Sequence, residues 1–113
     1  MSDCIFCKIA NGEIPSEIVY EDELMTVFKD AQPMAPVHVL MVPKTHISSL
    51  DDLSDENASL MANMMLKIKK VAKTLGLENG YRVVINCGED GQQTVKHLHI
   101  HILGKRKMTW PPG

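Results

Sequence analysis

Aromatic residues, net charge and long hydrophobic runs are all scarce in this 113-residue chain. Phenylalanine, tyrosine and tryptophan make up 4% of it, so the eight methionines must do much of the core filling. A formal net charge of −2 argues against general affinity for nucleic acid or for an acidic membrane surface. No apolar run is long enough to span a bilayer, and the opening residues lack a basic segment followed by an apolar one. We therefore expect one globular domain over residues 1–113, with no membrane contact.

Cysteine is scarce as well, and its count is odd. The three residues are Cys4, Cys7 and Cys87. Because no secretion signal is recognised, a reduced chain in the cytoplasm is expected rather than a disulfide framework. Cys4-x-x-Cys7 has the spacing of a zinc knuckle, in which one tight turn presents two thiolates. A redox pair and two unrelated small core residues are the alternatives, although a redox pair would suit a preceding strand and none is expected there.

Hydrophobic periodicity predicts an α+β fold. A short N-terminal helix capped by Asp3 is expected over 4–10, and a long amphipathic helix from the Ser54 cap to Leu75, just before Gly76. β-branched and apolar segments predict five strands, at 18–20, 25–28, 38–42, 81–86 and 95–103. The short connections between them indicate a five-stranded, mostly antiparallel sheet with the long helix on one face.

The most informative segment is the run from His97 to Leu103, in which three histidines alternate with aliphatic residues. Successive side chains of a strand point to opposite faces, so His97, His99 and His101 should share one face. Three imidazoles so close together cannot all be charged, and their protonation states must be divided by their neighbours. Two functions suit such a row. It can bind a metal, or its middle histidine can be a nucleophile that its neighbours orient.

Other residues of the chain allow metal binding and nucleophilic attack to be assigned to different histidines. If His46 and His97 join the two cysteines, a tetrahedral zinc site closes and His99 and His101 stay free for chemistry. The polar loop 88–94 precedes the histidines, and its glycines and Thr94 suit a phosphate cradle, although an ordinary loop is the alternative. Asp30 can accept hydrogen bonds from ribose hydroxyls or simply form a turn.

The chain resembles the histidine triad (HIT) family, and within it the Hint branch of histidine triad nucleotide-binding proteins. His97-Leu98-His99-Ile100-His101-Ile102-Leu103 matches the family's alternating signature, and the ending Trp110-Pro111-Pro112-Gly113 matches the branch. Further matches are Ile5-Phe6-x-Lys8-Ile9, Glu13-Ile14-Pro15, Pro43-Lys44-x-His46-Ile47-Ser48 and Gly80-Tyr81-Arg82. The cysteine pair is typical of the bacterial, zinc-containing type. One departure is Gln92, which stands where a glycine is common.

The resemblance implies a homodimer that hydrolyses purine nucleoside 5′-phosphoramidates through a nucleotidyl-histidine. His99 would be the nucleophile, with one ring nitrogen donating to the carbonyl of His97. His101 would stabilise the phosphoryl oxygens, Thr94 would reach the phosphate where the family has a serine, and His38 would back the triad. The other nucleotide-binding residues implied are Ile5, Phe6, Ile9, Phe28 and Leu40 for the base, Asp30 for the ribose, Asn86 and Gln93 for the phosphate, and Trp110 of the opposite subunit.

The resemblance also implies a structural zinc on Cys4, Cys7, His46 and His97, and no catalytic metal. A dinucleoside polyphosphate hydrolase or a nucleotidyl transferase is the alternative on the same fold. A non-catalytic nucleotide-binding module and a metal-storage protein that uses all three triad histidines are alternatives of other classes.

Overall fold

A five-stranded antiparallel sheet organises the molecule, as the sequence predicts. The computed structural model describes residues 3–113. The strands are β1 (Ile18–Glu21), β2 (Met25–Lys29), β3 (Val37–Pro43), β4 (Tyr81–Val84) and β5 (Ile100–Gly104). They lie in the order β1-β2-β3-β5-β4, and every neighbouring pair is antiparallel. The two longest pairings, β2–β3 and β3–β5, place β3 at the centre of the sheet, with the histidine-bearing strand β5 beside it.

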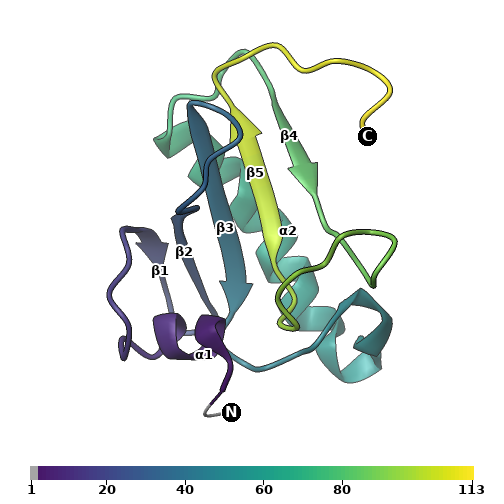
Figure 1. The fold of residues 1–113 in the computed structure, drawn as a ribbon. Helices are drawn as coiled ribbons and strands as arrows, with labels where there is room; N and C mark the ends of the chain where they lie inside the picture. The colour runs from purple at the N-terminus through teal and green to yellow at the C-terminus, as the bar shows by residue number, and fades with distance from the viewer. Residues whose placement is uncertain (1–2) are drawn as a thin grey trace.

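The sheet buries a hydrophobic cluster on each face. Helix α2 (Ala58–Thr74) packs across one face, and the short helix α1 (Ile5–Ala10) covers one end of the other (Figure 1). Methionines fill much of the α2 side, where Met25, Met41 and Met64 are fully buried. Phe6 and Ile9 of α1 pack on Phe28, Leu40 and Val42 of the sheet. The second cluster therefore ties α1 to the strand face that carries the histidines.

The long helix begins and ends close to the predicted positions. Ser54 caps a 3-10 turn (Asp55–Asn57) through a reciprocal capping box with Asn57, and α2 proper starts at Ala58. Beyond the helix, Gly76 adopts a φ of +76°, the left-handed conformation that a glycine stop provides. Within residues 3–113, α2 and the other helices are too short or too polar to cross a membrane.

Three predicted boundaries were wrong. Cys4, not Asp3, is the N-cap of α1, because its backbone is extended and its Sγ accepts the N–H of Cys7 at 3.3 Å. Residues 95–99 do not belong to β5. The β3–β5 register would place Leu98 opposite Pro43, which has no N–H to donate, and Leu98 donates to the carbonyl of Ile47 instead. The strand predicted over 81–86 ends at Val84, where its last paired residue in β5 is His101.

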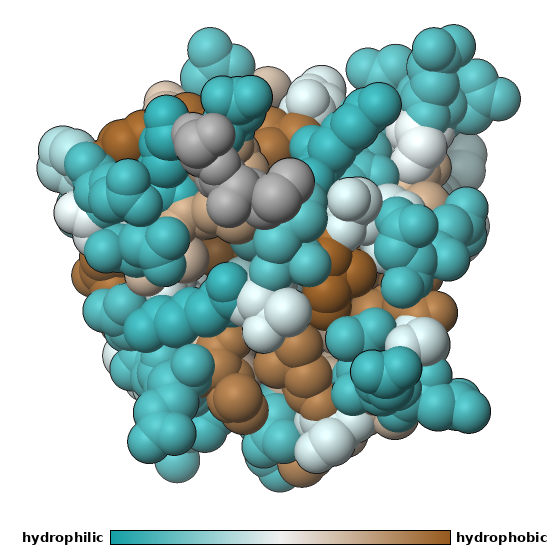
Figure 2. Space-filling view, turned by 90° about the horizontal axis from the view of Figure 1, so that it is seen from below, coloured by the Kyte–Doolittle hydropathy of each residue, from teal (hydrophilic) through white to brown (hydrophobic). Residues whose placement is uncertain are grey.

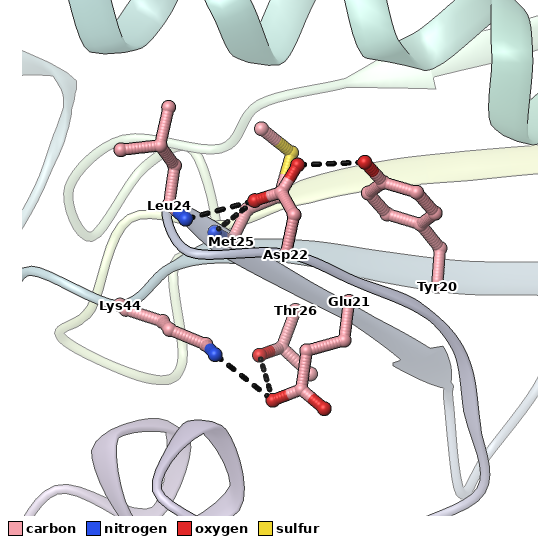
Figure 3. Close-up of polar contacts among 7 residues, drawn as sticks. All are labelled: Tyr20, Glu21, Asp22, Leu24, Met25, Thr26 and Lys44. Atoms are coloured by element: carbon pink, nitrogen blue, oxygen red, sulfur yellow. Dashed lines mark hydrogen bonds and ion pairs between the residues drawn. The ribbon is translucent and has the colours of Figure 1, made fainter.

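The β1–β2 hairpin anchors the segment that follows β3 (Figure 3). The Asp22 carboxylate accepts the N–H groups of Leu24 and Met25 and the Tyr20 hydroxyl, at 2.8, 3.0 and 2.6 Å. Burial works to raise the pKa of Asp22, but these hydrogen bonds outweigh it and hold the pKa below its usual value. Glu21 then binds Lys44 at 3.0 Å, which holds the chain in place two residues before His46.

Candidate active site and metal centre

The three triad histidines divide between two clusters. The ring of His97 turns toward α1 and lies among Cys4, Cys7 and His46. The rings of His99 and His101 stay together, with centroids 5.0 Å apart, and His101 lies against His38 at 5.2 Å. The expected common row is therefore split, because residues 95–99 leave the sheet before β5 begins.

The four atoms of the first cluster have the spacing of a tetrahedral metal shell. Cys4 Sγ lies 3.2 Å from His97 Nδ1, Cys7 Sγ lies 3.3 Å from His46 Nδ1, and the two Nδ1 atoms are 3.2 Å apart. A tetrahedral zinc with bonds of about 2.0–2.3 Å separates its ligand atoms by about 3.3–3.8 Å. Two thiolates and two imidazoles are also the donor set that zinc prefers. The cluster can hold a zinc ion, as the sequence predicts.

The far sides of the two rings suit metal binding through Nδ1. A carbonyl can only accept, so His97 Nε2–H donates to that of Pro43 at 2.9 Å, and His97 Nδ1 carries a lone pair. His46 Nε2 lies 3.4 Å from the Ser48 hydroxyl, which can accept its proton when His46 Nδ1 binds a cation. Burial is the main cause that lowers the pKa of His97, so the ring stays neutral as a ligand must.

Asp30, His38 and His101 form a second close cluster, but its tautomers do not fit a metal. His38 Nδ1 accepts the backbone N–H of Met34 at 3.0 Å, so the ring proton sits on Nε2. His38 Nε2 lies 2.9 Å from His101 Nδ1 and 3.3 Å from the Asp30 carboxylate. Burial is the larger influence on His38 and lowers its pKa, although Asp30 opposes it. The second cluster is a directional hydrogen-bond chain between neutral rings.

His99 has the tautomer of a nucleophile. Its Nδ1–H donates to the carbonyl of His97 at 2.7 Å, which leaves the lone pair on Nε2. The ring is 5% exposed, and the edge-to-face Phe6 ring, 5.0 Å away, restrains its orientation. Within the described chain no hydrogen bond occupies Nε2.

His101 supplies a donor beside that nucleophile. Its Nδ1 accepts from His38, so its proton is on Nε2, and this buried atom has no partner among residues 3–113. Burial, with smaller contributions from His99 and His38, lowers the pKa of His101 to about 4. A buried N–H without a partner costs about 1–3 kcal/mol, and a ligand oxygen would recover it. A lone pair and a donor thus lie side by side, as an attack on phosphorus requires.

The remaining predicted residues surround this pair in different ways. Phe6, Ile9, Phe28 and Leu40 come together in the apolar cluster beside the histidines, whereas Ile5 is 47% exposed at its edge. Asp30 is half-buried and accepts the N–H of Gln32 at 2.8 Å. Trp110 is 81% exposed, with its ring 5.8 Å from the Arg82 guanidinium, so it does not dock into its own subunit.

The loop before the histidines is braced from within. Gln93 accepts the N–H of Gly88 and donates to the carbonyls of Ser48 and Val95, so its side chain shapes the loop. Gln92 has a φ of +65°, a left-handed conformation that a glycine would adopt at lower cost. Thr94 is exposed and Asn86 half-buried, on the two ends of this loop.

Sequence reasoning missed several groups that orient the site. These are the carbonyl of Pro43, the N–H of Met34 and the hydroxyl of Ser48. Backbone groups carry no residue-type signal, so only Ser48, inside the motif that follows Pro43, was recognisable in advance. The end of the molecule that carries α1 is mostly hydrophilic, with hydrophobic side chains between the polar ones (Figure 2).

This fold and site define a small α+β protein whose paired histidines suit attack on a phosphate ester or amide. Comparisons with known proteins identify its family. A family model described as scavenger mRNA decapping enzyme C-terminal binding matches residues 3–110. A HIT-like protein of Synechococcus elongatus is 50% identical over 111 residues, which cover 98% of this chain and 97% of that one. Protein HitA of Neisseria gonorrhoeae is 51% identical over 104 residues, 92% and 97% of the two chains. The chain belongs to the histidine triad family.

Solved structures share the fold along nearly the whole chain. A HIT family hydrolase from Legionella pneumophila superposes with a TM-score of 0.96 at 49% identity, covering 98% of this chain and all of that one. A Zn-bound histidine triad protein from Mycobacterium smegmatis has a TM-score of 0.78 at 34% identity, covering 94% and 77%. A histidine triad nucleotide-binding protein from Candida albicans has a TM-score of 0.82 at 34% identity, covering 98% and 85%.

The low pKa of His101 predicts its behaviour during titration. Because burial disfavours the charged ring, its ¹⁵N resonances should keep the pattern of a neutral Nε2–H tautomer from about pH 8 to about pH 5, and change only near pH 4. Long-range ¹H–¹⁵N NMR of the histidine rings measures this, with a histidine-containing peptide as the reference. A midpoint near the ordinary value of about 6.5 would contradict the assignment.

Proposed function

We propose that this protein hydrolyses purine nucleoside 5′-phosphoramidates, compounds in which AMP or GMP is joined to an amine. The observation that carries the proposal is the pairing of a free lone pair on His99 Nε2 with an unsatisfied N–H on His101 Nε2. Membership of a family with hydrolases and nucleotide-binding proteins among its solved structures supports it. The P–N bond is inferred from the Trp-Pro-Pro-Gly ending that resembles the Hint branch.

The reaction then proceeds in two displacements. His99 Nε2 attacks the α-phosphorus, the P–N bond breaks, and its electron pair leaves with the amine, which takes up a proton. His101 Nε2–H and the Thr94 hydroxyl donate to the phosphoryl oxygens as charge develops on them. The His97 carbonyl accepts the remaining ring proton and stabilises the cationic nucleotidyl-histidine. Water next attacks phosphorus, releases the nucleoside monophosphate and returns His99 to its starting state.

The rest of the site binds the nucleotide. We assign the base to the apolar residues at the α1 end of the sheet, where Phe6 and Phe28 pack edge to face at 5.5 Å. Asp30 receives the ribose hydroxyls, and His38 keeps His101 in its donor tautomer. The phosphate lies between the histidines and the loop bounded by Asn86 and Thr94. Gln93 contributes by shaping that loop, because its own polar atoms are already bonded.

We further propose that Cys4, Cys7, His46 and His97 hold a structural zinc. All four ligand positions belong to the protein, so this site has no open position for a substrate and supplies no catalytic water. The Zn-bound relative from Mycobacterium smegmatis supports the assignment. Three free thiols also support location in a reducing compartment such as the cytoplasm.

Removing the nucleophile should separate chemistry from binding. His99→Ala and His99→Asn are expected to reduce turnover of an AMP amide below detection, because the imidazole is the only group of this proposal that bonds to phosphorus. AMP affinity should stay within about threefold of the wild type, since binding rests on other residues. Assays with a panel of AMP and GMP amides and dinucleoside polyphosphates measure this. An active His99→Ala protein would exclude the mechanism, and preference for polyphosphates would indicate the alternative hydrolase.

The zinc assignment is tested by metal analysis of matched cysteine variants. The wild type should contain about one zinc per chain, and Cys7→Ser should lose it and melt at a lower temperature. Cys87→Ser is the control, since Cys87 is also partly buried but lies outside the cluster, and it should keep its metal. Zinc-free wild-type protein whose melting is unaffected by chelators would disprove the site.

We also propose a homodimer that joins β4 of two subunits. β4 is an edge strand that exposes Tyr81 and Val83, and the Arg82 beside them holds the carbonyl of Thr109 at 2.9 Å. An uncovered edge with apolar side chains favours pairing with a second strand. Sedimentation equilibrium should give twice the chain mass of 12.6 kDa, and Val83→Lys should weaken the association. A monomer at micromolar concentration would be inconsistent with this proposal.

A further inference from the structure

A chain of hydrogen bonds connects an exposed arginine with the donor atom of the proposed active site. Arg106, just beyond β5, donates through Nε–H to the carbonyl of Met34 at 3.1 Å. The N–H of the same Met34 donates to His38 Nδ1 at 3.0 Å. His38 Nε2–H then donates to His101 Nδ1 at 2.9 Å, and His101 Nε2–H is left without a partner. Each bond in this series has one possible direction, because a neutral imidazole carries one proton.

The direction of these hydrogen bonds determines whether His101 Nε2 presents an N–H or a lone pair to the phosphate. If the Met34 N–H did not face His38, that ring could carry its proton on Nδ1 instead. His101 would then donate toward His38 and present a lone pair on Nε2. A lone pair would repel an anionic phosphoryl oxygen, whereas the N–H attracts it. The backbone at Met34 therefore selects the productive form of His101.

Met34 lies in a loop that has few other constraints. Residues 31–36 connect β2 to β3, and all of them except Ala35 are exposed. Local hydrogen bonds involve Asp30, whose carboxylate accepts the Gln32 N–H and whose own N–H reaches the carbonyl of His38. Among the described residues, Arg106 provides the one side-chain hydrogen bond that reaches this loop from a distant part of the chain.

We propose that Arg106 is a positioning residue, which binds the Met34 carbonyl and so keeps the Met34 N–H directed at His38, with the result that the proton of His101 faces the phosphate. This role rests on the proposed phosphoramidate hydrolysis, but it makes a separate prediction about tautomers. Asp30 also favours a proton on His38 Nε2, from 3.3 Å away, so losing Arg106 should bias the equilibrium without reversing it. The expected effect is therefore moderate.

Lys107 is the matched control. It is the next residue, is exposed, and carries the same charge, but it makes no side-chain hydrogen bond within residues 3–113. Arg106→Ala and Lys107→Ala remove equal charge from the same surface. A purely electrostatic influence on an anionic substrate would thus affect both variants alike, whereas positioning affects Arg106→Ala alone. Arg106→Lys retains a donor near the Met34 carbonyl and serves as the rescue variant.

The experiment combines steady-state kinetics on an AMP amide with long-range ¹H–¹⁵N NMR of the histidine rings. Arg106→Ala should lower kcat about 5- to 10-fold, with KM within about twofold. This is the loss expected when the hydrogen bond from His101 to the transition state is partly lost. Its His101 ring should show a measurable share of the Nδ1–H form. Arg106→Lys should recover most of kcat, and Lys107→Ala should match the wild type in both measurements.

Two results would overturn the proposal. One is an Arg106→Ala protein whose His38 and His101 tautomers equal those of the wild type. The other is an equal loss of kcat in Lys107→Ala. If wild-type protein cleaves no phosphoramidate, the proposed function fails, and the NMR comparison still decides whether Arg106 sets the tautomer of His101.

Discussion

The His97 residue is the point on which both parts of the site depend. Its Nδ1 faces the cysteine cluster, its Nε2–H is held by the Pro43 carbonyl, and its own carbonyl holds Nδ1–H of His99. One residue thus joins the N-terminal helix, the end of β3 and the proposed nucleophile. Because Pro43 cannot continue the sheet ladder, its carbonyl and the neighbouring chain are available for this purpose. The end of β3 at Pro43 thus positions His97, and His97 in turn orients the ring of His99.

Distances alone would not have distinguished the two histidine clusters. In both, ring nitrogens approach to within about 3 Å of a second donor or acceptor. The difference lies in the hydrogen bonds on the far sides of the rings. The Pro43 carbonyl takes up the ring proton of His97 and leaves a lone pair facing inward, as a metal ligand requires, and the Ser48 hydroxyl can do the same for His46. In the other cluster, the Met34 N–H occupies the lone pair of His38 Nδ1. The inner contact is therefore a hydrogen bond that His38 Nε2–H donates to His101 Nδ1.

The two faces of the sheet serve different purposes. The α2 face is a conventional core, in which methionines and branched aliphatic residues replace the scarce aromatics. The opposite face buries the few aromatics it has next to the histidines, and Phe6 contacts both the Phe28 ring and the His99 ring. Burial on this face lowers the pKa values of His38, His97 and His101, and the low local dielectric constant strengthens their directional hydrogen bonds. Phe6 of α1 therefore both fills the apolar cluster and restrains the ring of the proposed nucleophile.

Local sequence patterns determined much of this protein. The period of the long helix, the glycine at its end, the five strands and the alternation of histidines all follow from short-range stereochemistry, and the cysteine spacing indicated two members of the cluster that could hold a metal ion. The start of β5 and the split of the histidine row did not, because they depend on which backbone groups lie opposite Pro43 and Ile47. The tautomers of His38, His97, His99 and His101 were likewise decided by tertiary contacts. A ring proton goes where an acceptor is. For His97 and His38 those acceptors, the Pro43 carbonyl and the His101 ring, come from distant parts of the chain, whereas His99 donates to the carbonyl of His97 two residues away.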